Sequence, residues 1–141
     1  MKYFRIHSNE KAFITGQPRG LFVSVWKLVE SKSLSIYEEE KYWENRKYFE
    51  ETLPIPSFYI DNNSVKAITF FKENKKGLEI EEEMSFYFEM CRKYGIKLFK
   101  TTVEEIPGKL IYEDDYQIGV MPNRIVQEIV LELDKMSVEI G

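Results

Sequence analysis

Residues 106–120, in the last third of the chain, read IPGKLIYEDDYQIGV and form the densest pattern in the sequence. Two apolar runs, Lys109–Tyr112 and Gln117–Met121, flank an acidic turn at 113–115. Short apolar runs on either side of a polar turn are typical of a β-hairpin. We therefore predict that these two runs pair as antiparallel strands.

The rest of the chain extends this hairpin into a sheet with helices. Strands are expected at Lys2–His7, at Phe58–Ile60 and Val65–Phe71 around a turn at 61–64, and at Ile96–Thr102. Helices are expected at Leu21–Ser31, from a capping box at Ser35 and Glu38 to about Thr52, from Gly77 to Gly95, and at Arg124–Met136. This order predicts an α+β fold, a mostly antiparallel sheet with helices packed on one face.

A chain of 141 residues suits one hydrophobic core. We predict a single domain over residues 1–121 and a C-terminal helical extension over 122–141. The apolar face of that helix, which includes Ile125, Ile129 and Leu133, is too wide to leave in water. It docks on the domain or pairs with a second copy, and we expect a homo-oligomer formed through 123–137.

Composition excludes several functional classes. One Cys and one His cannot form a disulfide framework or a Cys/His zinc site. The net charge of −4 argues against a protein that binds duplex nucleic acid, which would need a cationic surface. The chain has no apolar run of 18 residues, so we predict a cytoplasmic protein that does not contact a membrane.

Aromatic residues make up 15% of the chain and include nine Tyr. Because each buried Tyr hydroxyl needs a hydrogen-bond partner, one small core does not easily hold so many. Some of them are expected to line a surface where another molecule binds, unless the aromatics simply fill the core.

The first strand carries two candidate site residues. Alternation places Tyr3, Arg5 and His7 on one face of this strand. Arg5 can bind a phosphate or carboxylate through two parallel hydrogen bonds, or it can form an ion pair with Glu113 or Asp115. His7 is the one candidate for acid–base chemistry near neutral pH, although a lone strand histidine is more often structural.

The hairpin carries the densest polar pattern. Glu113 and Gln117 lie four residues apart across the turn, with Tyr112 and Tyr116 beside them. Such a group can hydrogen-bond a base or an amide while the tyrosine rings stack on it. The alternative is an ordinary hairpin with an acidic tip, whose carboxylates only form the turn.

No cofactor or metal is expected. The acidic turn could offer oxygen ligands to Mg²⁺ or Ca²⁺, but its spacing does not match a calcium-binding loop. Cys91 shares an apolar helix face with Met84 and Phe88, and we predict that it is a core residue.

Several stretches together resemble a family of small uncharacterised bacterial and phage-associated proteins. They are 20–22, 26–28, 53–59, 67–72, 93–95 and 107–120, and the resemblance spans residues 2–121. It implies a single domain and no particular reaction. It also includes the strand that holds Phe70 and Lys72, and we add these two residues to the candidate ligand-binding residues. The family more often has Trp where this chain has Phe70.

These features favour a binding protein without catalysis. Its ligand would be a small anionic, nucleotide-like molecule or a toxin-type partner protein. The net negative charge of the chain favours a basic toxin, because complementary charges accelerate association. The alternative is a small nucleotide-processing enzyme of the ADP-ribosyl-transfer type that uses Arg5 or His7 with Glu113. A third possibility, a purely structural role, depends on the C-terminal helix.

Overall fold

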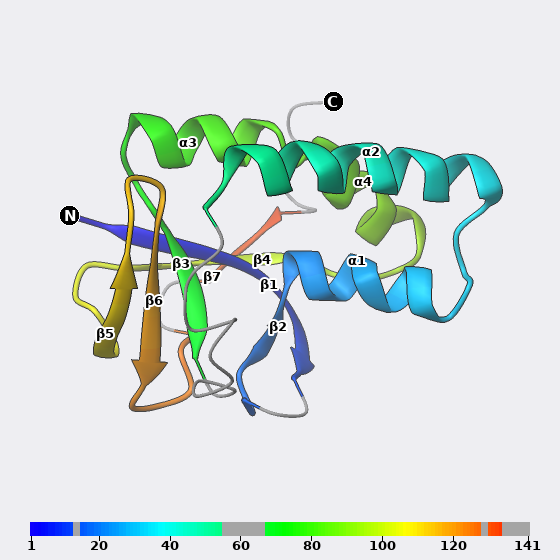
Figure 1. Ribbon diagram of the computed structural model, residues 1–141. Helices are drawn as coiled ribbons and strands as arrows, with labels where there is room; N and C mark the ends of the chain where they lie inside the picture. Colours follow the sequence, from blue (N-terminus) through cyan, green and yellow to red (C-terminus); the bar gives the residue numbers. More distant parts are fainter. Residues whose placement is uncertain (13–14, 55–66, 128–129, 134–141) are drawn as a thin grey trace.

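The structure is a computed structural model that describes residues 1–12, 15–54, 67–127 and 130–133 (Figure 1). Within these residues, seven strands form one antiparallel sheet and four helices pack against it. This arrangement confirms the predicted α+β class and the antiparallel sheet.

The sheet is built around the first strand. Its strands are β1 (Tyr3–Lys11), β2 (Pro18–Gly20), β3 (Ile68–Lys72), β4 (Phe99–Val103), β5 (Gly108–Glu113), β6 (Gln117–Pro122) and β7 (Val130–Glu132). They lie in the order β5-β6-β3-β1-β4-β7, and β2 pairs with β1. The predicted hairpin at 109–121 is therefore confirmed as β5 and β6.

Strands β2 and β3 pair with the same edge of β1 and diverge from each other. The other edge of β1 pairs with β4 over Tyr3–His7. On the shared edge, β3 pairs with Tyr3 and Phe4, whereas β2 pairs with His7 and Lys11. Arg5 therefore lies at the point where the two strands separate, which determines the position of the candidate site described below.

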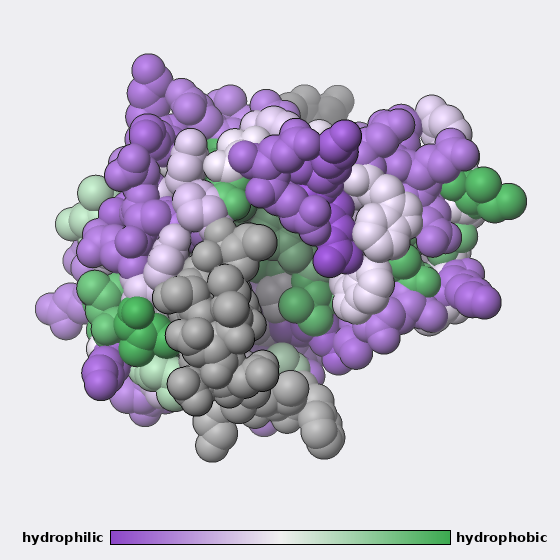
Figure 2. All heavy atoms as spheres, in the orientation of Figure 1, coloured by the Kyte–Doolittle hydropathy of each residue, from purple (hydrophilic) through white to green (hydrophobic). Residues whose placement is uncertain are grey.

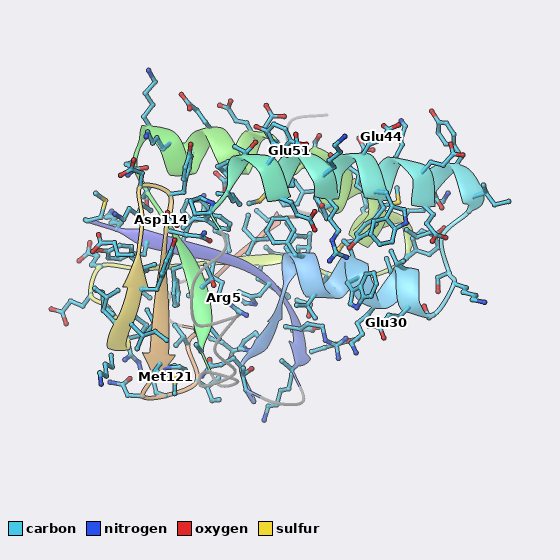
Figure 3. All side chains as sticks on the ribbon, in the orientation of Figure 1. Arg5, Glu30, Glu44, Glu51, Asp114 and Met121 are labelled. Carbon is cyan, nitrogen blue, oxygen red and sulfur yellow. The ribbon has the colours of Figure 1, made fainter. Side chains whose placement is uncertain are left out.

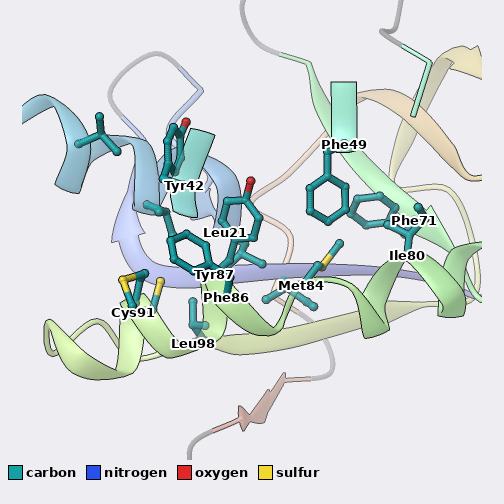
Figure 4. Packing of buried hydrophobic residues seen from close by; sticks show 14 of the residues in the cluster. Leu21, Tyr42, Phe49, Phe71, Ile80, Met84, Phe86, Tyr87, Cys91 and Leu98 are labelled. Carbon is teal, nitrogen blue, oxygen red and sulfur yellow. The ribbon is translucent and has the colours of Figure 1, made fainter. Parts of the chain in front are cut away.

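The helices are α1 (Leu21–Glu30), α2 (Ile36–Thr52), α3 (Lys75–Glu82) and α4 (Ser85–Lys93). They cover one face of the sheet, as predicted, and Phe4, Ile6 and Phe71 of that face pack with residues of all four helices (Figure 4). Adjacent strand residues point to opposite faces, so Phe70 packs in a second cluster with Ile118 and Val120.

The predicted capping box of α2 is present. The Ser35 hydroxyl accepts a hydrogen bond from the Glu38 backbone N–H, and the Glu38 carboxylate accepts one from the Ser35 N–H. Both contacts satisfy N–H groups that a helix start leaves without intrahelical partners. Cys91 is fully buried in the main core, as predicted.

The helix predicted from Gly77 to Gly95 is two helices. The Asn74 side chain caps α3 by accepting from the Gly77 N–H, so the helix begins before Gly77. Glycine is required there because a Cβ at position 77 would collide with the Lys72 carbonyl. The first helix ends at Glu82 with Glu83 as its C-cap, and α4 begins at Ser85.

The helix predicted at Arg124–Met136 is wrong for residues 124–127 and 130–132. Residues 124–127 are not helical, and Val130–Glu132 form β7, which pairs with β4. The β-branched residues that suggested a helix face also favour a strand, and pairing with the outer edge of β4 supplies backbone hydrogen bonds. The homo-oligomer prediction thereby loses its basis.

The boundaries of two strands differ from the predicted ones. The strand predicted to begin at Ile96 begins at Phe99, and the strand predicted at Val65–Phe71 is β3 over Ile68–Lys72. Its predicted partner at Phe58–Ile60 lies outside the described residues. In the described part of the chain, no helix has both the length and the apolar character needed to cross a bilayer.

Candidate functional site

A cavity of about 790 Å³ opens where β2 and β3 diverge. Its walls come from β1, β2, β3, α1 and α2, with single residues from α4 and β6. Figure 2 shows this side of the molecule hollowed beneath α2, with apolar groups inside the hollow. Figure 3 shows Arg5 between β3 and β2, below the helices. The volume lies in the range of small-molecule sites.

Aromatic rings form the helical wall of the cavity. Tyr87 of α4 contacts Phe22 of α1 and Phe49 of α2, with ring centroids 4.9 and 5.6 Å apart. Trp26 and Tyr42 extend this wall, with centroids 6.2 Å apart. Burial raises the pKa of the Tyr87 hydroxyl, so this group stays neutral. The wall therefore offers flat apolar surfaces to a ligand.

The cavity is also rich in positive charge. Arg5, Arg19, Lys27 and Arg46 line it, and Glu50 is the one carboxylate among its described lining residues. Because the protein as a whole has a net charge of −4, this concentration of cations is local. Cationic side chains beside an apolar wall suit an anionic ligand that carries a ring.

Arg46 is held in place by two indoles and two hydrogen bonds. Its guanidinium carbon lies 5.3 Å from the Trp26 ring centroid and 5.2 Å from the Trp43 centroid. Its Nε donates to Glu50 Oε1 at 2.9 Å, and its Nη1 donates to the Tyr42 hydroxyl at 3.3 Å. The Glu50 hydrogen bond is the largest cause of the raised pKa of Arg46.

His7 does not line the cavity. It is buried, with Nδ1 2.7 Å from the Ser8 carbonyl oxygen and Nε2 2.7 Å from the Thr101 hydroxyl. A carbonyl only accepts, so Nδ1 carries the proton and Nε2 accepts from Thr101. Burial lowers the pKa of His7, which keeps the ring neutral. These contacts favour the structural interpretation of His7.

The polar groups of the hairpin pair with one another or with neighbouring strands and helices. Lys72 Nζ lies 2.7 Å from Glu113 Oε2, and Lys76 Nζ lies 2.9 Å from Asp115 Oδ2. These ion pairs differ from the predicted alternative, in which Glu113 or Asp115 pairs with Arg5. The Tyr112 hydroxyl donates to Asp114 Oδ2 at 2.6 Å. Burial and this contact raise the pKa of Tyr112 to about 12.

Asp114 organises the turn. Its Oδ1 accepts from the backbone N–H groups of Tyr116 and Gln117 at 2.7 and 2.9 Å. The Tyr116 ring lies under Lys76, whose Nζ is 5.4 Å from the ring centroid. These contacts support the acidic-tip interpretation of the hairpin, because they fix the turn without a ligand.

The structure brings two of the eight candidate residues to the cavity, Arg5 and Gln117. Gln117 is buried, and its Nε2 donates to the Pro54 carbonyl at 2.9 Å. The other six are absent from the lining residues: His7, Phe70, Lys72, Tyr112, Glu113 and Tyr116. Phe70 is fully buried in the second core cluster, so its ring is not available for stacking on a ligand.

Arg19, Trp26 and Arg46 line the cavity but are not among the residues predicted for the site. Arg19 lies between two glycines and next to a proline at 16–20, a composition that is typical of a turn and gives no sign of a ligand site. The spacing of Tyr42, Trp43, Arg46 and Glu50 was a usable signal, because residues three and four apart share one side of a helix. Among the described residues, no cluster of three His, Cys, Asp or Glu could hold a metal ion.

Comparisons with models of protein families, with curated proteins and with solved structures find no match for this chain. The resemblance described above therefore has no support from them, and the function has to be argued from the cavity.

Proposed function

We propose that this protein binds a small anionic, ring-containing molecule of the nucleotide-like class in the cavity between β2 and β3, without converting it. The observation that carries the proposal is the lining itself, in which three arginines lie beside an aromatic wall. Rings stack on aromatic faces, and guanidinium groups bind phosphate or carboxylate oxygens.

A binding function has more support than turnover. The described lining residues include no His or Cys, and their one carboxylate, Glu50, accepts a hydrogen bond from Arg46. The ADP-ribosyl-transfer alternative required Arg5 or His7 to act with Glu113. Arg5 lines the cavity, but Glu113 does not, and it pairs with Lys72.

A thermal-shift screen tests the proposal. The probes are AMP, ADP, ATP, NAD⁺ and cyclic dinucleotides, with adenosine as a neutral ring. A ligand at 100 times its Kd contributes about 2.7 kcal/mol of stability and raises the Tm by several degrees. Chromatography of the released ligand should recover it intact.

A matched pair of variants locates the binding. Val23 is 46% exposed and lines the cavity, so Val23→Trp should obstruct it and abolish the shift. Leu78 is 39% exposed on α3, outside the cavity, so Leu78→Trp should keep the shift. A blank screen would contradict the proposal and favour a protein partner. A shift that survives Val23→Trp would place the site elsewhere.

A further inference from the structure

We infer that the anionic group of this ligand is a phosphate and that it binds at one end of the cavity, between Arg5, Arg19 and the first turn of α1. The inference rests on the proposed function and assigns an orientation to the ligand. The ring would lie toward Trp26 and Phe49, and the phosphate would lie toward β2.

Arg5 is fixed next to the start of α1. Its Nη1 donates to the Pro18 carbonyl at 2.6 Å, which ties the guanidinium to β2. Its Nη2 would lie 3.4 Å from a Cβ built at Gly20, the N-cap residue of α1. The Arg5 guanidinium therefore lies beside the N-cap of α1.

Arg19 provides the second charge and an unsatisfied donor. Its Nη1 donates to Glu10 Oε2 at 2.9 Å. Its Nε is the one buried side-chain nitrogen or oxygen without a hydrogen-bond partner among the residues that the structure describes. A buried donor without a partner costs stability, and Arg19 itself lines the cavity, so a phosphate bound there would lie beside its charge.

The first turn of α1 adds backbone donors to the two arginines. Leu21, Phe22 and Val23 line the cavity, and the turn contains no acidic residue. The first N–H groups of a helix lack intrahelical partners and carry the positive end of its dipole. Together with the guanidinium groups, they offer donors from several directions. A tetrahedral phosphate can accept from all of them, whereas a planar carboxylate suits a single guanidinium fork.

The test measures binding of pyrophosphate, AMP and adenosine by calorimetry to wild type, Arg19→Gln, Arg5→Lys and Arg92→Gln. Arg19 forms its ion pair with a 64% exposed Glu10, so Arg19→Gln should fold normally. Arg5→Lys retains the charge but loses the paired donors of guanidinium. Arg92 is exposed on α4 and outside the cavity, so Arg92→Gln is the matched control.

We expect Arg19→Gln and Arg5→Lys to weaken AMP and pyrophosphate binding by about tenfold to a hundredfold. Adenosine affinity and every affinity of Arg92→Gln should stay at wild-type values. If AMP binds Arg19→Gln and Arg5→Lys as tightly as wild type, the phosphate site is overturned while the proposed function stands. If adenosine binds as tightly as AMP, the phosphate site is also overturned. If no ring-carrying probe binds, neither here nor in the thermal-shift screen, the proposed function fails.

Discussion

At the scale of single residues, His7 shows how burial decides between two chemical roles. Its two ring nitrogens have protein partners, Ser8 and Thr101, and its ring lies 6.2 Å from that of Phe99. A general base has to reach a substrate, and this ring is 1% exposed. The contacts instead tie the middle of β1 to β4.

We predict that the pKa of His7 in the folded protein lies below its ordinary value of 6.5. Burial is the main cause, and the nearby charge of Arg5 adds to it. The unfolded chain therefore takes up a proton at higher pH than the folded protein, so stability is lost as pH falls below about 6.5 toward the folded pKa. Because His7 is the one histidine in the chain, NMR can follow its Hε1 signal without assignment ambiguity.

The control is the same titration in concentrated urea, where the signal should move with an ordinary histidine pKa. A folded-state pKa at or above 6.5 would contradict the buried, neutral ring and would reopen an acid–base role for His7.

At the scale of elements, Glu38 joins the start of α2 to the end of α4. Its carboxylate accepts from Lys93 Nζ at 2.6 Å, from the Tyr94 hydroxyl at 2.5 Å and from the Ser35 N–H at 2.9 Å. These contacts lower the pKa of Glu38 to about 2, and the hydrogen bond from Lys93 is the largest cause. A residue that caps its own helix thus also fixes the packing of a second one.

We predict that the stability contributed by Glu38 depends on pH. Because its pKa is lowered in the folded state, the contribution is complete above the ordinary value of 4.5 and is lost as pH falls toward about 2. Urea denaturation should show Glu38→Gln to be less stable than wild type at pH 7, with the difference disappearing near pH 2. Glu40→Gln, at an exposed position of the same helix, should match wild type throughout. A constant deficit across this range would show that the charge is not involved.

Elements with strong local signals were predictable from the sequence. The capping box of α2 and the turn between β5 and β6 depend on residues within a few positions of each other. The last strand has no such signal. Ile129, Val130 and Leu133 fit the spacing of a helix face, and only pairing with β4, about thirty residues earlier in the chain, makes β7 a strand. A local sequence pattern contains no information about a strand partner that lies far away in the chain.

At the scale of the whole molecule, the cavity depends on contacts that no local pattern reveals. Arg5 was identified because a strand arginine suggests anion binding, but Arg19 and Arg46 join it only because β2 and β3 diverge beneath α1 and α2. The dense polar pattern of the hairpin residues favoured a ligand site at that hairpin. That pattern is accounted for by contacts such as Lys72 with Glu113.

The segment after β6 is also coupled to the cavity, through Gln17. The Gln17 Nε2 donates to the Arg124 carbonyl at 2.7 Å, and its Oε1 accepts from the Val126 N–H at 2.9 Å. Val126 is 2% exposed and packs in the second core cluster. Thr15 and Arg19, on either side of Gln17, line the cavity. The C-terminal segment therefore holds the 15–19 segment against the rest of the domain.

We predict that Gln17→Ala lowers both stability and phosphate affinity. It removes two hydrogen bonds and leaves the buried Val126 N–H without its acceptor, which should cost about 2 kcal/mol in urea denaturation. Because Arg19 would be less firmly positioned, pyrophosphate binding should also weaken severalfold. Gln127→Ala, at the exposed position directly after Val126, should change neither quantity. A loss of stability with unchanged affinity would show that Gln17 anchors the chain without positioning Arg19, and no change in stability would contradict the buried hydrogen-bond pair itself.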